Sequence, residues 1–346
     1  MAKRPTIADV ATAAGVSVAT VDRVLNRRNP VREATADRVL QAAERIGFYA
    51  TTLIEERIGR TLPQRRLGFL LQKRDDPFYR QLGLDLVAAT KASPLMRGVP
   101  VLEFMDELVP SKIAARIAET GALVDAVAVV AVEHPHVTEA VEALARKGVP
   151  VFTLISDLTA PSRAGYLGLD NLKRGRLAAW TFSRLAPRPG PIGILVGTHR
   201  YLGQELSEIA FRTYLREHAK DFRPLEPLVN LDDPRLAHEA TAELLGKRSD
   251  LVGIYMAGGG MAGMIAALRE EAGGAELIVV CNELTVETRA ALIDGIVDLV
   301  IATPTAALAQ RAVAAMAAAI ARGKADAEVG PTMIQLPAEL YVSANV

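Results

Sequence analysis

Two short helical patterns, separated by a glycine within the first 26 residues, constrain this chain more than any other feature of its sequence. In the first pattern, Thr6 is suited to cap a helix whose third residue is Asp9, and such a pair forms a capping box. The apolar residues that then share one face of the helix are Ile7, Val10 and Ala11. The sequence therefore predicts an amphipathic helix that begins directly after Thr6.

Gly15 supplies a turn, and a second helical pattern follows it. Ser17 is suited to cap this second helix, and Val21, Val24 and Leu25 point inward. Two such helices joined at a glycine form a helix-turn-helix, a motif that places its second helix in the major groove of DNA. We therefore expect the outward residues to meet base edges; they are Val18, Ala19, Asp22 and Arg23.

Residues 31–47 carry a third helical pattern, which Gly47 closes. Three short helices bury little surface, so we expect a DNA-binding headpiece over residues 1–48 that is only marginally stable alone. Residues 49–65, with Pro63 and several charges, are interpreted as a hinge or linker. The core positions of the third helix are Ala36, Val39, Leu40, Ala43 and Ile46.

The charge of the chain is unevenly distributed. The 40 basic and 40 acidic residues cancel overall, but residues 1–66 hold 12 Lys and Arg against 7 Asp and Glu. The remaining residues, 67–346, hold 28 Lys and Arg against 33 Asp and Glu. A basic head on a mildly acidic body is typical of a DNA-binding arm joined to a domain that does not bind nucleic acid.

Several classes of protein are excluded by simple features of the sequence. The single cysteine, Cys281, rules out a disulfide framework and is interpreted as a packed thiol. His134 and His136 lack further metal-ligand partners, so we expect no metal site there. Asp9 interrupts any signal peptide, and the alanine-rich stretch 298–320 contains Pro304 and charged or polar residues. We expect a cytoplasmic protein with no membrane partner.

From residue 67 onward, apolar runs alternate with amphipathic helical patterns. Runs that are hydrophobic on both faces and separated by helices predict parallel sheets covered on each side. Ligands of such sheets bind beyond the carboxyl ends of the strands, so the residues that follow each run are candidates for a site. The runs are 67–71, 99–103, 126–130, 149–153, 191–196, 251–255 and 277–280.

These residues together resemble the lactose-repressor/galactose-repressor (LacI/GalR) family of transcription regulators. The headpiece carries the resemblance in TIADVA at 6–11, AGVSVATV at 14–21, RVLN at 23–26 and RVL at 38–40. The rest is similar to the family's effector domain, which shares its fold with periplasmic sugar-binding proteins. The segments of this chain that are similar to the effector domain are DPFY at 76–79, GLDN at 168–171 with Gly175, and DGIVD at 294–298.

The resemblance implies an all-α helix-turn-helix headpiece followed by a two-lobed α/β effector domain with parallel sheets over residues 66–346. We expect the first lobe to comprise residues 66–166 and 303–328, and the second lobe 167–302 and 329–346. The resemblance further implies a homodimer that binds a near-palindromic double-stranded DNA operator, with a small effector bound between the lobes. No leucine heptad follows the last expected strand, so we expect a dimer rather than a tetramer.

By family position, Val18, Ala19 and Arg23 read bases. Arginine bonds bidentately to guanine, whereas Val18 and Ala19 offer apolar contact, for example to a thymine methyl. Asp22 stands where the family usually has serine; it could accept from a cytosine amino group, pair with a neighbour or face water. The residues expected to contact the DNA backbone are Ser17, Thr20 and Asn26, and Thr6 joins the DNA-contacting set.

The sequence departs from the family in the linker and in the effector site. Where the family's linker has a proline-asparagine pair followed by a leucine that wedges into the minor groove, this chain has Ala50-Thr51 and then Leu53, Ile54 and Ile58 in a different phase, so the sequence does not decide whether a kinking hinge helix forms. The arginine that sugar-binding relatives use is replaced near Ser207, and an asparagine-aspartate pair is replaced by the glycines 258–260.

The candidate effector site is acidic and aromatic. Carboxylates accept from hydroxyls and aromatic rings pack on the apolar face of a sugar, so a sugar or polyol fits, as does an amine-bearing ligand. A helix cap or a solvated loop explains each single acid equally well, and core packing explains Phe78. The candidate contacts are Asp76, Phe78, Tyr79, Asp170, Tyr201, Gln204, Gly259 and Glu283.

Two other functions remain open at this point. The glycines of 258–263 match a dinucleotide-binding pattern, with Glu283 twenty residues beyond, as in a nicotinamide-dependent enzyme. The same turn could instead hold an anionic effector at a helix N-terminus. Because no catalytic residues accompany the pattern, we expect no enzymatic activity and no cofactor. A sugar-binding protein without a regulatory role would leave the headpiece unexplained.

Overall fold

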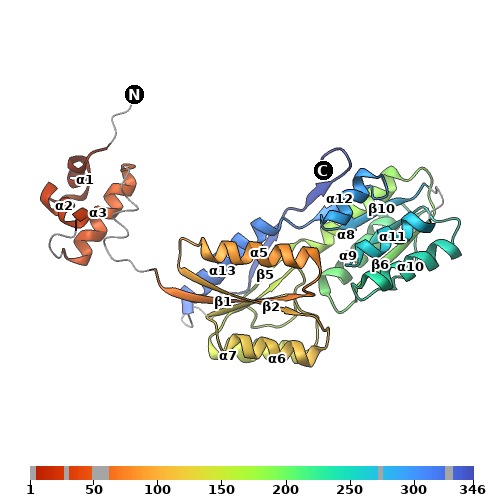
Figure 1. Ribbon diagram of the computed structural model, residues 1–346, viewed down its shortest axis with the longest axis horizontal. Helices are drawn as coiled ribbons and strands as arrows, with labels where there is room; N and C mark the ends of the chain where they lie inside the picture. The colour runs from red at the N-terminus through yellow and green to blue at the C-terminus, as the bar shows by residue number, and fades with distance from the viewer. Residues whose placement is uncertain (1–4, 27–30, 49–61, 272–275, 324–329) are drawn as a thin grey trace. The chain divides into compact units, whose positions relative to one another are not determined.

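The computed structural model describes residues 5–26, 31–48, 62–271, 276–323 and 330–346 (Figure 1). It divides into two compact units, Met1–Pro63 and Gln64–Val346. The expected linker, 49–65, lies mostly outside the described residues. At its end the expectation is wrong by two residues, because Gln64 and Arg65 already pair in the first strand. The residues expected to decide whether a hinge helix forms, 50–58, are not among those described.

The described part of the first unit holds three helices, as the sequence predicts. Thr6 and Asp9 form the expected capping box, and Gly15 takes the left-handed conformation (φ 64°) that the turn requires. The apolar faces meet in a small core that includes Val10, Val21, Val39 and Leu40. The helices are α1 (Ile7–Ala14), α2 (Val18–Asn26) and α3 (Glu33–Arg45).

Arg38 of α3 fastens the third helix to the turn. Its guanidinium donates to the carbonyl oxygens of Ala14 at 2.8 Å and Gly15 at 3.1 Å. Carbonyls at the end of a helix lack partners inside the helix, so this side chain satisfies groups that would otherwise be unpaired. A polar contact therefore joins α3 to the end of α1 and the turn, in addition to the apolar core.

The first lobe of the second unit is a parallel sheet with helices on both faces. Its strand order is β12-β5-β4-β3-β1-β2, and α5 and α13 cover one face while α6 and α7 cover the other (Figure 1). The strands are β1 (Gln64–Gln72), β2 (Arg97–Met105), β3 (Ala126–Val129), β4 (Val151–Leu154), β5 (Gly165–Leu169) and β12 (Thr332–Leu336). The helices are α5 (Pro77–Lys91), α6 (Pro110–Gly121), α7 (Pro135–Lys147) and α13 (Thr305–Arg322).

The second lobe repeats this plan. Its sheet runs β13-β11-β10-β9-β6-β7 with β8 beside β6, and every pairing is parallel except that of β13 with β11. The strands are β6 (Pro191–Val196), β7 (Arg223–Pro224), β8 (Leu228–Val229), β9 (Gly253–Met256), β10 (Ile278–Asn282), β11 (Leu299–Ala302) and β13 (Glu339–Tyr341). The helices are α8 (Asn171–Leu185), α9 (Leu202–His218), α10 (Pro234–Lys247), α11 (Met261–Glu271) and α12 (Val286–Ile293).

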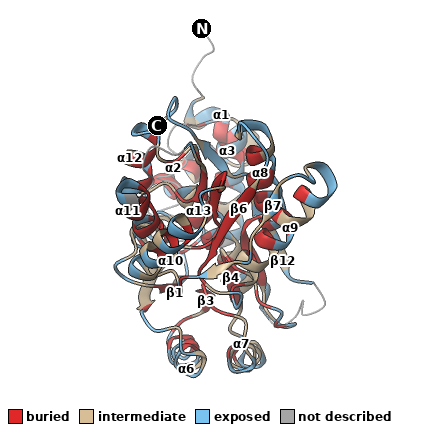
Figure 2. Ribbon diagram, turned by 90° about the vertical axis from the view of Figure 1, so that its right-hand side faces the viewer, coloured by how far each residue is buried: buried red, intermediate tan, exposed pale blue. Residues whose placement is uncertain are grey.

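The central strands of both sheets are buried on each face, as the apolar runs predict. Each predicted run overlaps an observed strand, and residues of β3, β4, β6 and β9 are buried along the whole strand. Figure 2 shows the buried strands enclosed by helices whose outer faces are exposed. No helix in the described ranges combines the length and the apolar composition needed to cross a bilayer.

The expected lobe boundaries need correction at two places. We expect residues 329–346 in the second lobe, but β12 pairs with β5 in the first sheet, and only β13 joins the second sheet. The first crossing comes after Leu169 rather than after residue 166. The apolar runs miss both strands, because two of the five residues of β5 are glycine and β12 is only half-buried. A half-buried strand lacks the continuous apolar run on which the prediction rested.

Gly263 shows how closely the helices of the second lobe approach each other. A Cβ at this position of α11 would lie 1.7 Å from the carbonyl oxygen of Pro234 in α10. Two helices can approach this closely only where one of them lacks a side chain. Helix packing is thus sufficient reason for the last glycine of the 258–263 pattern.

We predict that Gly263→Ala lowers the free energy of unfolding by about 1 to 3 kcal/mol, because α10 and α11 must separate to admit the methyl group. Urea unfolding followed by circular dichroism measures the change. Gly246→Ala in α10 is the matched control, because nothing lies within 4 Å of its Cβ position. That control is expected to be neutral or stabilising by up to about 1 kcal/mol. Equal effects of the two substitutions would contradict the packing argument.

Candidate functional site

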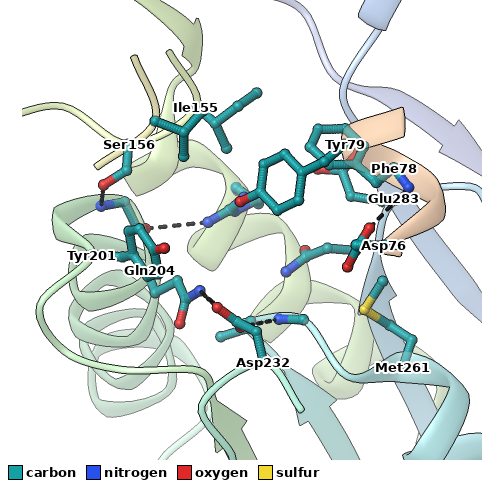
Figure 3. Close-up of a pocket in the computed structure, with 17 residues that line it drawn as sticks. Asp76, Phe78, Tyr79, Ile155, Ser156, Tyr201, Gln204, Asp232, Met261 and Glu283 are labelled. Carbon is teal, nitrogen blue, oxygen red and sulfur yellow. Dashed lines mark hydrogen bonds between the residues drawn. The ribbon is translucent and has the colours of Figure 1, made fainter. Parts of the chain in front are cut away.

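The carboxyl ends of the two sheets face each other and enclose a cavity of about 70 Å³ (Figure 3). This is room for a few water molecules or one small molecule. The first lobe contributes Asp76, Phe78, Tyr79, Val130, Ile155 and Ser156. The second contributes Arg174, Tyr201, Gly203, Gln204, Asp232, Ala257, Gly258, Gly259, Met261, Asn282 and Glu283.

Backbone strain is concentrated at this cavity. Among the described residues, five that are not glycine have positive φ: 36° at Lys73, 65° at Ile155, 53° at Leu231, 52° at Asp232 and 60° at Glu283. Each follows a strand, and three of them line the cavity. Non-glycine residues keep such conformations only where their surroundings hold them there, which is common at ligand-binding sites.

Three carboxyl groups face the cavity, and each receives hydrogen bonds from its own lobe. Asp76 accepts from the Phe78 N–H at 2.9 Å, which caps α5. Asp232 accepts from the Gly259 N–H at 2.6 Å and from the Gln204 amide at 3.2 Å. These bonds orient both carboxylates without neutralising them.

Glu283 is the most deeply held of the three. Its two oxygens accept from the N–H and the hydroxyl of Thr303, both at 2.8 Å. Thr303 lies directly after β11, where the chain leaves the second sheet. The carboxylate therefore ties the end of β10 to one of the segments that cross between the lobes.

Burial raises the pKa of each of these carboxyl groups above its ordinary value. The hydrogen bonds just described oppose the rise. The groups also act on one another: the charge of Asp232 raises the pKa of Asp76, and the charge of Asp76 raises the pKa of Glu283. The three carboxyl groups thus form one electrostatically coupled cluster.

The cluster has one buried cation beside it. Arg174 of α8 is 7% exposed, and its guanidinium donates to the Ser207 hydroxyl at 3.0 Å and to the Gly203 carbonyl at 3.2 Å. Its charge lowers the pKa of Glu283, against the larger effect of burial. The sequence suggested that an arginine is lost near Ser207; the structure brings one to Ser207 from another helix.

Aromatic and apolar side chains form the remaining walls. The rings of Phe78 and Tyr79 meet edge to face with centroids 5.2 Å apart. Figure 3 shows Tyr79 and Asp76 on one side of the cavity and Tyr201 and Gln204 on the other. Burial raises the pKa of both tyrosines well above the ordinary value, so each keeps its hydroxyl proton at neutral pH.

Three direct contacts hold the lobes together around the cavity. The Lys73 ammonium, after β1, donates to the carbonyl oxygens of Leu231 at 2.6 Å and Asp232 at 2.9 Å. The Gly203 N–H donates to the Ser156 hydroxyl at 3.1 Å. The Glu133 N–H donates to the Arg200 carbonyl at 2.7 Å. These hydrogen bonds join the two lobes beside the cavity, and a motion that opened the lobes would break them.

The structure brings seven of the eight candidate residues to the cavity wall: Asp76, Phe78, Tyr79, Tyr201, Gln204, Gly259 and Glu283. Asp170 is the exception, and its assignment to the site needs correction. It caps α8, accepting from the Lys173 N–H at 3.1 Å, and its other oxygen pairs with the Lys173 ammonium. The helix cap, the simpler interpretation, holds for this residue.

Sequence reasoning missed Arg174 and Asp232 as parts of the site. Arg174 lies inside a helix, where only the packing of α8 on α9 directs it inward. Asp232 follows β8, a strand of two residues that leaves no recognisable pattern. Asn282 follows the predicted run 277–280, as Glu283 does, so the rule on strand ends points to it although it is not among the eight candidate contacts.

The glycine turn does not present a free phosphate site. The Gly259 N–H, at the start of α11, is bonded to the Asp232 carboxylate. A Cβ on Gly258 would lie 2.3 Å from the backbone nitrogen of Gly197, so this glycine too has a packing role. The Asp232 carboxylate thus occupies the position at the Gly259 N–H where an anionic effector or a pyrophosphate would bind.

The candidate DNA-contacting residues lie on or before α2. Val18 is 51% exposed, and Ala19 and Arg23 are also exposed. Ser17 accepts from the Thr20 N–H at 3.2 Å, which caps α2, while Thr6 is engaged with Asp9. The Asn26 amide donates to Asp22 at 2.7 Å, so within the headpiece Asp22 pairs with a neighbour one turn along the helix.

Comparison with known proteins identifies both units. The sequence pattern of bacterial regulatory proteins of the lacI family matches residues 6–50, and that of the periplasmic binding protein domain matches residues 67–325. The chain is 43% identical over 77 residues to the ribose operon repressor of Bacillus subtilis, covering 22% of this chain and 23% of that protein. It is 37% identical over 98 residues to the maltose regulon regulatory protein MalI of Escherichia coli, covering 28% of this chain and 27% of that one. These alignments span about a quarter of each relative.

Solved structures show the fold of the second unit. A solute-binding protein of an ABC transporter from Agrobacterium vitis, bound with α-D-tagatopyranose, has a TM-score of 0.71 at 18% identity, covering 81% of this chain and 95% of that one. One from Burkholderia graminis, in complex with D-arabinose, has a TM-score of 0.72 at 19% identity, covering 81% and 96%. The chain belongs to the family of periplasmic binding protein domains and carries, ahead of that domain, the DNA-binding domain of the lacI family of regulatory proteins, as its sequence motifs predict.

Proposed function

We propose that this protein is a transcriptional repressor that binds a specific operator in the cytoplasm and responds to a small sugar or polyol held between its lobes. The observation that carries the proposal is the combination, in one chain, of an exposed helix in a helix-turn-helix and a cavity between two lobes. The named relatives, two regulators of sugar operons, support it.

The chemistry of α2 supports sequence-specific recognition. Arg23 is the one basic residue in the α2 sequence, and its guanidinium suits the paired acceptors of guanine. Val18 and Ala19 suit apolar contact with a thymine methyl. Because Asp22 pairs with Asn26, we assign Asp22 to orienting that amide rather than to direct base contact. The residues proposed to hold the DNA backbone are Thr6, Ser17, Thr20 and Asn26.

A homodimer follows from this mode of binding. One small headpiece covers only a half-site, so two copies related by a two-fold axis would read a near-palindromic operator. Sedimentation equilibrium of the full chain, free and with operator DNA, tests the assignment.

The cavity supports an effector with many hydroxyl groups. Carboxylates accept from hydroxyls, and the Phe78 and Tyr79 rings can pack against the apolar face of a sugar. A nicotinamide-dependent enzyme is disfavoured, because Asp232 already bonds the backbone of the glycine turn. A sugar-binding protein without a regulatory role would have no use for α2.

A thermal-shift screen followed by operator binding tests the proposal as a whole. The probes are D-ribose, D-arabinose, D-tagatose, D-allose and D-fucose with their amino, deoxy and phosphorylated analogues. Operator fragments selected from genomic DNA then report binding with and without each hit. We expect at least one hit to change operator affinity. The regulator assignment fails if the chain prefers no DNA sequence, with or without ligand.

We predict that Arg23→Ala weakens the preference for operator over random DNA by about 1 to 3 kcal/mol, because a base-specific contact is lost. Competition gel-shift assays at fixed salt measure both affinities. Arg32→Ala removes the same charge outside α2 and should leave the preference unchanged. If Arg23→Ala weakened binding to both DNAs equally, Arg23 would contact phosphate rather than base.

We predict that Lys73→Met lowers the affinity for the best sugar of the screen by about tenfold, because the closed lobes lose both ammonium hydrogen bonds. Operator binding by the ligand-free protein should persist. Isothermal titration calorimetry measures the affinity, with Lys91→Met, an exposed position at the end of α5, as the control. Unchanged affinity would show that the Lys73 contact plays no part in closure.

A further inference from the structure

The charges around the cavity do not balance. Asp76, Asp232 and Glu283 line it, whereas Arg174 is the one basic residue among the described residues that line it. The Lys73 ammonium is near Asp232, but its hydrogen bonds go to backbone carbonyls across the lobe contact. With the three acids ionised, the cavity carries excess negative charge.

The hydrogen-bond inventory points in the same direction. Asn282 is 4% exposed; its amide nitrogen donates to the Met256 carbonyl, and its oxygen has no partner in the described part of the chain. The Gln204 oxygen accepts from two backbone N–H groups, and its nitrogen donates to Asp232. The buried Asn282 oxygen needs a donor, and Gln204 has none to spare.

Burial raises the pKa of each of these acids, so a positive charge placed beside them would favour their ionised forms. Backbone N–H groups of Phe78, Gly259 and Thr303 donate to the three carboxyl groups, and such bonds favour the charged form. A neutral hydroxyl supplies a donor but no charge, so it leaves the mutual repulsion of the acids in place. An ammonium group supplies several donors and a compensating charge. A metal ion is not suited, because the described residues hold no group of three or more potential ligands placed to bind one.

We infer that the effector is a polyhydroxylated amine, such as an amino sugar, whose ammonium group binds among Asp76, Asp232, Glu283 and the Asn282 oxygen. The inference rests on the proposed function, in that the cavity holds the effector. It adds the charge of that effector, which the sugar-binding fold alone does not specify.

Matched compounds test the inference on the full-length protein. D-glucosamine, D-galactosamine, D-mannosamine and 1-amino-1-deoxy derivatives of pentoses are each compared at pH 7 with the parent hydroxyl sugar and the neutral N-acetyl derivative. We expect at least one amine to bind about tenfold or more tightly than both neutral partners in calorimetry. The inference is overturned if no amine binds or if a neutral partner binds at least as tightly in every set. A neutral sugar that binds and alters operator affinity would leave the proposed function intact.

A charge-neutralising variant locates the ammonium group. Asp76→Asn removes one charge yet keeps a side chain that caps α5 well, so the fold should be retained. We expect it to reduce the preference for the amine over its hydroxyl partner by about tenfold. Asp170→Asn makes the same change at the cap of α8, outside the cavity, and should retain the full preference. A full preference in Asp76→Asn, or an equal loss in both variants, would contradict this placement.

Discussion

The site depends on the parallel pairing of the strands. Parallel strands all end at the same edge of a sheet, so segments far apart in the sequence deliver their first residues to one place. In this protein two such edges face each other. The charged cluster therefore comes from three separate strand ends, those of β1, β8 and β10, and it exists only when both lobes are folded and closed.

Closure concentrates two unfavourable features in one place: strained backbone and buried like charge. The residues with positive φ include Lys73, Asp232 and Glu283, which are also members of the charged cluster or of the contact across it. Opening the lobes would expose the carboxylates to water and break the Lys73 hydrogen bonds. A ligand that compensates the charge stabilises the closed form selectively, and differential stabilisation of one form is what a regulatory effector requires.

Much of this architecture could be predicted from the sequence, because apolar periodicity and capping residues act locally. The capping box at Thr6, the turn at Gly15 and the central strands of both sheets were all evident. The crossing strands β5 and β12 and the inward turn of Arg174 were not, because they are specified by contacts with distant segments. Asp170 shows the reverse case: like Asp76 it follows a strand and caps its own helix, yet only Asp76 lines the cavity.

A single strand, β1, separates Lys73 from the end of the first unit in the sequence. β1 begins at Gln64, directly after the first unit, and Lys73 follows its last residue. A strand within a sheet is stiff, so a change at the Lys73 contact acts on the same element to which the headpiece segment is joined. The headpiece is small and has little core of its own. For the proposed repressor, a modest change in how the headpiece is presented would therefore be enough to change operator affinity without any rearrangement inside α2.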